Sequence, residues 1–179
     1  MQRKKTNSII MKFGGTSVGS PKMIKQVIEI VATTKQPVAG IVVSAFAKVT
    51  NQLIEAAKLA SNRDKQYETL FSLIVTRHQE AIAKLITDKE RQQETILQMQ
   101  KMLSELESVL KGVYLLKELS PKTLDLILSY GERLSAYSIS QAFQDKGIQA
   151  EFIDTRMLVK TDNTFGYALT SGDFNADGK

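Results

Sequence analysis

The chain has 179 residues, enough for about one domain, and 42% of them are hydrophobic, as in ordinary globular proteins. It has no cysteine, which excludes a disulfide framework and thiolate chemistry, and no apolar run is long enough for a membrane helix. The net charge of +5 comes from residues 1–30, where six residues are basic and one is acidic, whereas a nucleic-acid binder spreads such charge over a face. We therefore expect a cytoplasmic protein that binds neither nucleic acid nor membrane.

The first third of the chain predicts a strand, a loop, a helix and a second strand. Residues 8–13 form a short apolar run that meets glycines at once, which is typical of a buried strand. Ser20 and Pro21 suit the N-cap and the first position of a helix, and apolar residues then recur at helical spacing. Residues 38–44 are almost continuously apolar, as in a parallel strand covered on both faces. The pattern is that of a βαβ unit.

The middle of the chain predicts helices only. Residues 64–111 contain no proline or glycine, and their apolar residues fall at helical spacing. The segment is too short for a long coiled coil. We expect two antiparallel helices, divided near Thr87 and Asp88, as a helical insertion whose second helix ends at Gly112.

The last third predicts further helix and a third strand. Ser120 and the proline after it begin a helix, Gly131 is expected to interrupt it, and a helical stretch over 132–146 follows. Residues 148–153 read as a strand parallel to the first two, which predicts a three-layer α/β fold. From residue 160 on, polar residues and glycines predict loop, and the chain looks cut short.

Residues 12–19, Lys-Phe-Gly-Gly-Thr-Ser-Val-Gly, are the strongest local signal for a binding site. Glycines between a buried strand and a helix N-terminus let backbone N–H groups approach an anion, and the helix dipole favours negative charge there. The segment is not a Walker loop, because Lys12 precedes the glycines, and it lacks the spacing of a dinucleotide fingerprint. Lys12 lies in an otherwise apolar strand, where a buried, unpaired ammonium would be costly. These features favour a phosphate-binding loop over an ordinary strand-to-helix turn.

Two further segments carry side chains that suit a small polar substrate. Ser44, Thr50 and Asn51 follow the second strand, at the edge where open α/β sheets bind ligands, although Thr50 or Asn51 could equally cap a helix. Glu132 stands at an expected helix start, where the dipole favours a carboxylate, and capping is again the alternative. His78 lies among charged and polar residues of a helix, which predicts a solvated face. No cluster of histidines or cysteines indicates a protein metal site.

Residues 12–19, 43–51 and 131–135 together resemble the aspartate kinases of the amino-acid kinase family. They are similar to that family's opening lysine and glycine loop, its second signature and its glutamate-bearing helix start, in this order. Lys48, where many relatives have glycine, and residues 108–120 are similar to the bifunctional aspartokinase and homoserine dehydrogenase type.

The resemblance implies a fold and a domain organisation. The fold would be the three-layer amino-acid-kinase-like fold, with a mainly parallel sheet and a helical insertion over 64–111, truncated at the C-terminus. Residues 1–179 would form the N-terminal part of the catalytic domain, without the nucleotide-gripping half and the regulatory domains. A substrate-binding arginine and a later Gly- and Ser-rich segment are also absent before Lys179, so this fragment alone is expected to be inactive.

The resemblance also implies transfer of the γ-phosphoryl group of MgATP to the side-chain carboxylate of L-aspartate, the first step of lysine, threonine and methionine biosynthesis. A carboxylate with a pKa of ~3.9 is already ionised at pH 7, so no general base is required. Lys12 would be the catalytic residue that bridges the transferring group. The ATP-binding residues would be Lys12, Phe13, Gly14 and Gly15, with Mg²⁺ held mainly through the phosphates of ATP and not by protein ligands.

The aspartate would be held by Ser44 and Thr50, and Glu132 would receive its α-ammonium group, with Arg133 in a structural role. The full-length protein is expected to be a homo-oligomer. Two alternatives stay open. One is another member of the family that acts on glutamate or a nucleoside monophosphate, and the other is a non-enzymatic helical interaction module built on residues 64–111.

Overall fold

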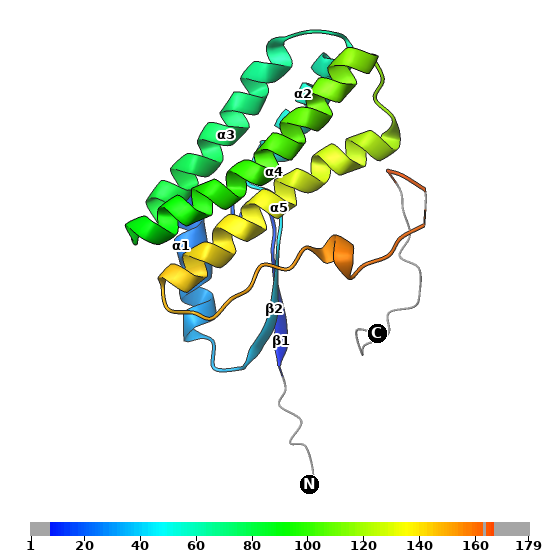
Figure 1. Cartoon of the computed structure of the whole chain (residues 1–179). Helices are drawn as coiled ribbons and strands as arrows, with labels where there is room; N and C mark the ends of the chain where they lie inside the picture. The colour runs from blue at the N-terminus through cyan, green and yellow to red at the C-terminus, as the bar shows by residue number, and fades with distance from the viewer. Residues whose placement is uncertain (1–7, 163, 167–179) are drawn as a thin grey trace.

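The computed structural model describes residues 8–162 and 164–166. The expected basic tail and the polar end beyond residue 166 therefore lie outside the described residues. In chain order the elements are β1 (Ile9–Phe13), α1 (Pro21–Thr33), β2 (Val38–Val43), α2 (Val49–Ser61), α3 (Gln66–Leu85), α4 (Lys89–Leu116), α5 (Pro121–Asp145) and the short 3₁₀ helix η1 (Thr155–Met157) (Figure 1).

Strands β1 and β2 pair in parallel, with α1 as the connection between them. Their register places Phe13 opposite Val43, so the predicted βαβ unit is confirmed. The hydroxyl of Ser20 accepts a hydrogen bond of 3.4 Å from the amide of Met23, as expected for the N-cap of α1. Helix α1 buries the face that its spacing predicted, which consists of Ile24, Val27, Ile28 and Val31.

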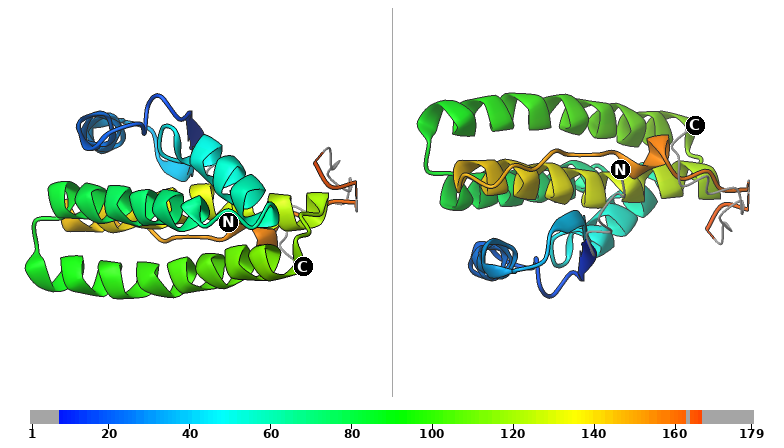
Figure 2. Two further views of the ribbon diagram at one scale, coloured as in Figure 1. Left: turned by 90° about the horizontal axis from the view of Figure 1, so that it is seen from above. Right: turned by 90° about the horizontal axis from the view of Figure 1, so that it is seen from below.

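Helices α2, α3, α4 and α5 pack against one another and form the bulk of the molecule. Figure 2 shows α4 on one side of α3 and α5, and α1 with the two strands on the opposite side. The described residues are thus mainly helical. Their sheet has two strands, so it is smaller than the sheet of the three-layer fold that the sequence predicted. None of the helices in this part of the chain combines the length and the apolarity that a membrane crossing needs.

The predicted pair of helices in the middle of the chain is present as α3 and α4, and the division between them lies at residues 86–88. The carboxylate of Asp88 caps α4 by accepting from the amide of Arg91 at 2.8 Å. The prediction that Gly112 ends this helix was wrong, because α4 continues to Leu116. Buried neighbours such as Val113 pack against the core there, and this packing outweighs the low helix propensity of one glycine.

Helix α5 runs without a break past Gly131, so the predicted interruption was also wrong. Ser120 does cap it, by accepting from the amide of Thr123 at 3.1 Å. The far end of α5 is tied to the turn before α4 by Asp145, whose side chain is only 1% exposed. Its carboxylate accepts from the amides of Thr87 and Asp88, both at 3.0 Å.

The environment of Asp145 keeps its carboxylate ionised. Burial alone would raise its pKa, but the hydrogen bonds from the Asp88 amide, the Lys146 ammonium and both donors of Thr87 outweigh burial and hold the pKa well below its usual range. The turn between α3 and α4 is therefore joined to the end of α5 by a charged group.

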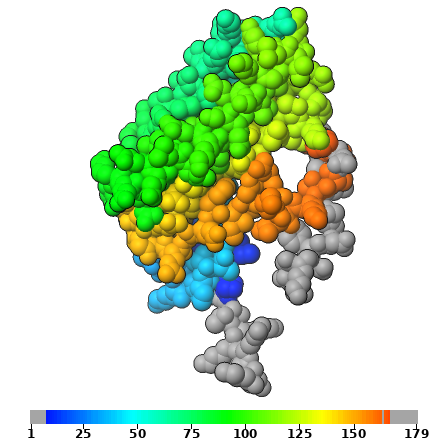
Figure 3. All heavy atoms as spheres, in the orientation of Figure 1, coloured from blue at the N-terminus to red at the C-terminus, as the bar shows by residue number. Residues whose placement is uncertain are grey.

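Residues 148–153 do not form the predicted third strand. Their side chains alternate between half-buried and exposed, as a strand's would, but the described sheet consists of β1 and β2 alone. The segment lies along α5 instead (Figure 3). Gln144 of α5 donates a hydrogen bond of 2.6 Å to the carbonyl of Ala150, and the rings of Tyr137 and Phe152 meet edge to face at 5.8 Å. The period-two pattern is thus met by a helix surface, and no strand partner lies beside it among the described residues.

Candidate active site

The carboxyl ends of β1 and β2 lie at the same edge of the sheet because the strands are parallel. The amide of Ser44 donates a hydrogen bond of 3.2 Å to the carbonyl of Phe13, one residue beyond the paired register. A Cβ atom added to Gly15 would lie 3.6 Å from the carbonyl oxygen of Ala45 and 3.9 Å from Oγ of Ser44. The glycine loop after β1 and the segment after β2 therefore lie side by side.

The glycine loop closes on itself but leaves three consecutive amides without an acceptor in the part of the chain that the structure describes. The carbonyl of Gly14 accepts hydrogen bonds from the amides of Ser17 and Val18, at 2.9 and 3.2 Å. Within the described residues, no hydrogen bond of the loop uses the amides of Gly14, Gly15 or Thr16 as donors. A short run of free N–H groups next to a strand end forms a concavity that binds anions. This arrangement suits the oxygen atoms of a phosphate.

The end of the glycine loop is held by α3. Nη2 of Arg77 donates a hydrogen bond of 3.1 Å to the carbonyl of Gly19. Gly19 itself has little room, since a Cβ there would lie 3.1 Å from the carbonyl oxygen of Gly15 and 3.2 Å from Cβ of Ala47. Arg77 could not be identified from the sequence, because nothing in the spacing of a helix shows that one arginine reaches a loop 58 residues earlier.

Lys12 is exposed, so the expected problem of a buried ammonium does not arise in the described structure. Strand alternation turns its side chain to the same face as that of Ile10, which is 73% exposed. Its register partner in β2, Val42, is 50% exposed. Phe13, the next residue, packs against the core from the other face. Lys12 thus stands on the open face of the sheet, two residues before the free amides begin.

The segment between β2 and α2 begins with Ser44 at this edge, and Thr50 follows in the first turn of α2; both residues are half-buried. Helix α2 begins at Val49, with Lys48 as its N-cap in the left-handed region at φ 72°. Thr50 and Asn51 therefore lie inside the helix, and the alternative that one of them caps it was wrong. Lys48, with its unusual backbone, thus lies between Ser44 and Thr50 in the sequence.

Glu132 lies in the interior of α5 and is exposed, so the argument that placed it at a helix N-terminus was wrong. The buried Gly131 before it does not break the helix but allows close packing. A Cβ on Gly131 would lie 3.0 Å from Cβ of Ala45 and 3.3 Å from Cδ1 of Leu53. The glycine lets α5 approach the segment after β2 closely. The structure therefore brings the third motif to the first two, with Glu132 next to the point of contact.

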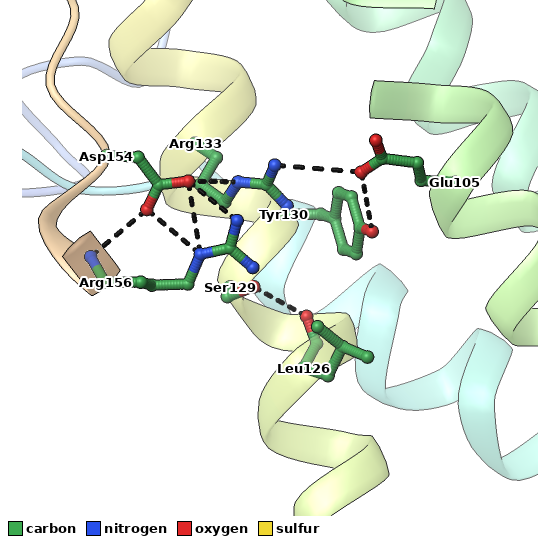
Figure 4. Close-up of polar contacts among 7 residues, drawn as sticks. All are labelled: Glu105, Leu126, Ser129, Tyr130, Arg133, Asp154 and Arg156. Carbon is green, nitrogen blue, oxygen red and sulfur yellow. Dashed lines mark hydrogen bonds and ion pairs between the residues drawn. The ribbon is translucent and has the colours of Figure 1, made fainter. Parts of the chain in front are cut away.

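The arginine after Glu132 belongs to a network that joins α4, α5 and η1 (Figure 4). Nε of Arg133 lies 3.1 Å from Oδ2 of Asp154, and its guanidinium lies 4.6 Å from the centre of the Tyr130 ring. Glu105 of α4 lies 3.8 Å from Nη2 of Arg133 and accepts a hydrogen bond from the Tyr130 hydroxyl. The hydrogen bond from Arg156 is the main cause that lowers the pKa of Asp154. These contacts agree with the structural role expected for Arg133.

His78 is fully buried, so the prediction of a solvated face was wrong. Its Nδ1 lies 2.8 Å from the carbonyl oxygen of Ile74, and its Nε2 has no hydrogen-bond partner among the described residues. Burial, with a smaller effect from the charge of Arg77, lowers the pKa of His78 to about 4. The spacing of Ile74, His78 and Ile82, four residues apart on one helix face, is the signal that could have revealed this burial.

Known proteins resemble the chain at the level of sequence. Residues 7–173 match the model of the amino acid kinase family. The chain is 31% identical over 150 residues to bifunctional aspartokinase/homoserine dehydrogenase 2, chloroplastic, of Zea mays, a match that covers 84% of this chain and 16% of the relative. It is 32% identical over 190 residues to aspartokinase 1, chloroplastic, of Arabidopsis thaliana, covering 97% of this chain and 31% of the relative. The chain thus spans less than a third of the length of these relatives.

Solved structures resemble the chain in fold. Escherichia coli aspartokinase III in complex with lysine and aspartate, in the T-state, matches with a TM-score of 0.81 at 24% identity, over 92% of this chain and 35% of that chain. The same enzyme with aspartate and ADP, in the R-state, matches with a TM-score of 0.79 at 23% identity. The expectation of an amino-acid-kinase-like fold is confirmed by these matches. With the family match over residues 7–173, the chain belongs to the amino acid kinase family, and aspartokinases are among its homologues.

Proposed function

We propose that the complete gene product carrying this chain is an aspartate kinase that transfers the γ-phosphoryl group of MgATP to the side-chain carboxylate of L-aspartate. The observation that carries the proposal is the run of free amides at Gly14, Gly15 and Thr16, which lies beside Ser44 at the carboxyl edge of the two strands. The proposed site for the donor phosphates would thus lie next to a polar side chain for the acceptor.

The phosphate side of the reaction is assigned to the glycine loop and Lys12. The amides of Gly14 and Gly15 would bind oxygens of the nucleotide phosphates, and the chain at Phe13 leads into this loop. The ammonium group of Lys12 would neutralise the charge on the transferring phosphoryl group, where a fixed donor contributes most. Bound Mg²⁺ supplies further charge neutralisation, and it would be held by the phosphates because amides and an ammonium group bind anions.

The acceptor side is assigned to Ser44, Thr50 and Glu132. The aspartate carboxylate is already ionised at neutral pH, so these residues need only hold the substrate in line with the phosphoryl group. The hydroxyls of Ser44 and Thr50 would hold its polar groups, and the exposed carboxylate of Glu132 would receive its α-ammonium group. Support for this acceptor comes from the E. coli relative, which was solved with aspartate and with ADP.

The packing of α3 argues against the alternative of a separate helical interaction module. Arg77 and His78 of this helix are engaged with the glycine loop and with the segment after β2. Helices α3 and α4 also bury their apolar faces within the helical layer. The insertion is therefore built into the support of the candidate site.

A hydroxylamine-trapping assay tests the proposal. The complete gene product with MgATP should form an acyl phosphate with L-aspartate and none with L-glutamate. Release of ADP, measured in parallel, should show no transfer to a nucleoside monophosphate, whose product hydroxylamine does not trap. Residues 1–179 by themselves should form none, because both substrates must be fixed in line and no residue assigned here grips the nucleotide base. Transfer to glutamate or to a nucleotide would replace the proposed substrate, and no transfer to any acceptor would refute the kinase assignment.

Two further parts of the proposal concern the protein as a whole. We expect it to be a cytoplasmic homo-oligomer, which light scattering of the complete gene product and fractionation of the cells would measure. A monomer by scattering, or recovery in an organelle fraction, would contradict these expectations without affecting the assignment of the reaction.

A further inference from the structure

A buried hydroxyl on α5 joins two of the three residues assigned to the amino-acid substrate. Ser135 is 0% exposed, and its Oγ lies 2.7 Å from the carbonyl oxygen of Ser44 and 3.0 Å from the carbonyl oxygen of Glu132. A serine hydroxyl has one proton to donate, and the shorter distance favours the Ser44 carbonyl. The bond to Ser44 spans 91 residues of sequence.

The other serines of α5 behave differently. The hydroxyls of Ser129, Ser138 and Ser140 donate to the carbonyls of Leu126, Leu134 and Tyr137, all within the same helix. Such bonds are the usual way in which a helix satisfies a serine side chain. Ser135 has the same option through Glu132, yet its shorter contact leaves the helix. The contact with Ser44 is therefore specific to this position.

The contact completes the support of Ser44. Its amide donates to the carbonyl of Phe13 at 3.2 Å, and its carbonyl accepts from Ser135 at 2.7 Å. The two peptide groups that flank Ser44 are thus fixed, one by β1 and the other by α5. Because φ and ψ of a residue are set by its two flanking peptide planes, the direction of its Cα–Cβ bond is fixed as well.

We propose that Ser135 is a positioning residue, which aims the side chain of Ser44 at the acceptor substrate by holding its carbonyl group. The inference rests on the proposed function, since the acceptor is the aspartate assigned above. Gly131 allows the approach of α5 that this contact needs, because a Cβ there would lie 3.0 Å from Cβ of Ala45. Ser135 does not touch the substrate and acts only through Ser44 and the backbone of Glu132.

The test compares Ser135→Ala with Ser138→Ala in the complete gene product. Ser138 is an equally buried serine of the same helix, but its hydroxyl stays within α5, so it controls for the loss of a buried hydroxyl. Ser135→Ala should raise KM for aspartate about tenfold, the size expected for one lost buried hydrogen bond, and should change KM for ATP by less than about twofold. Ser138→Ala should change neither constant by more than about twofold. Equal effects of both variants, or equal effects on both substrates, would overturn the proposal.

A second measurement separates this inference from the proposed reaction. Hydrogen exchange of residues 44–50 should be at least about fivefold faster in Ser135→Ala than in Ser138→Ala, because the segment loses its bond to α5. A wild-type protein that forms no acyl phosphate would refute the kinase, while this exchange result would still decide whether Ser135 holds Ser44. Should Ser135→Ala fail to fold, Ser135→Cys keeps the size with a weaker donor, and exchange at the wild-type rate in that variant would overturn the proposal.

Discussion

The imidazole ring of His78 stacks on the phenyl ring of Phe46, with 4.8 Å between the ring centres and 18° between the ring planes. Phe46 belongs to the segment after β2 that carries Ser44, and both rings are buried. Helix α3 thus supports the candidate acceptor side through an aromatic contact and the glycine loop through Arg77. The charge state of His78 therefore affects the core directly beneath the candidate site.

We expect the stability of the chain to depend on pH through His78. The folded pKa of about 4 lies below the ordinary value of 6.5, so the unfolded chain binds more protons between these values. The stabilisation is complete above pH 6.5 and is lost as the pH falls towards 4, by about 2 to 3 kcal/mol between pH 7 and pH 4.5. Urea unfolding at these two pH values measures it, and His78→Phe, which keeps a ring against Phe46, should remove that difference.

This prediction can be assigned to one residue because the chain has a single histidine. The carboxylates contribute equally to the wild type and to His78→Phe, so only the difference between the two proteins matters. An imidazole proton resonance that titrates near pH 6.5 in the folded protein would contradict the prediction.

Replacement of Lys12 by alanine should lower kcat of the complete gene product by about 10² or more, since loss of one preorganised charge donor costs ~2.7 to 4 kcal/mol of transition-state stabilisation. Lys25→Ala is a suitable control, because Lys25 is an exposed lysine on α1. Steady-state kinetics with saturating aspartate and MgATP measure the effect. A kcat within a few-fold of the wild type would remove Lys12 from the site.

Glu132→Gln should act mainly on KM for aspartate and leave KM for ATP unchanged. The α-ammonium group is remote from the reacting carboxylate, so its contact has similar strength in the ground state and in the transition state. Titration of each substrate against a fixed excess of the other gives both constants. An unchanged KM for aspartate would leave Glu132 as a surface residue of α5.

The backbone of Lys48 predicts an unusual order of stability between two variants. At φ 72° a side chain is strained and glycine is not, so Lys48→Gly should be more stable than Lys48→Ala by about 1 kcal/mol. Both variants remove the lysine, which cancels any contribution of its charge. Urea denaturation of the two proteins measures the difference, and a more stable alanine variant would contradict the strain.

Local signals predicted the parts of the fold that depend on neighbouring residues. Ser20 and Ser120 mark helix starts because a hydroxyl caps free amides within three residues, and the division near Thr87 follows from the change in apolar spacing. The third strand was wrong because residues 148–153 have a strand's alternation, but what lies beside them is a helix. Gly131 was misjudged for the same reason, since its role depends on Ala45, 86 residues earlier in the chain.

The position of the candidate site in the fold could be predicted from the sequence, but the residues that support it from other helices could not. Parallel strands bring their carboxyl ends to one edge, so the proximity of Gly15 and Ser44 followed from the βαβ pattern. Arg77, His78 and Ser135 were missed because each acts on a segment far away in the sequence. Their contacts depend on how the helices pack against one another, and this packing cannot be predicted from local patterns in a single sequence.

Asp145 and His78 lose their contributions to stability at different pH values, so different parts of the helical layer become easier to open as the pH falls. The contribution of the Asp145 carboxylate is complete above the usual aspartate value of about 3.9 and is lost only as the pH falls further, because its folded pKa lies well below that value. At pH 4.5 the bonds from Thr87 and Asp88 are therefore intact, while the stabilisation from a neutral His78 is already much reduced. Mild acid thus lowers the free energy needed to open α3 around His78, because the exposed imidazole then binds a proton, whereas opening of the turn that leads into α4 costs as much as at neutral pH.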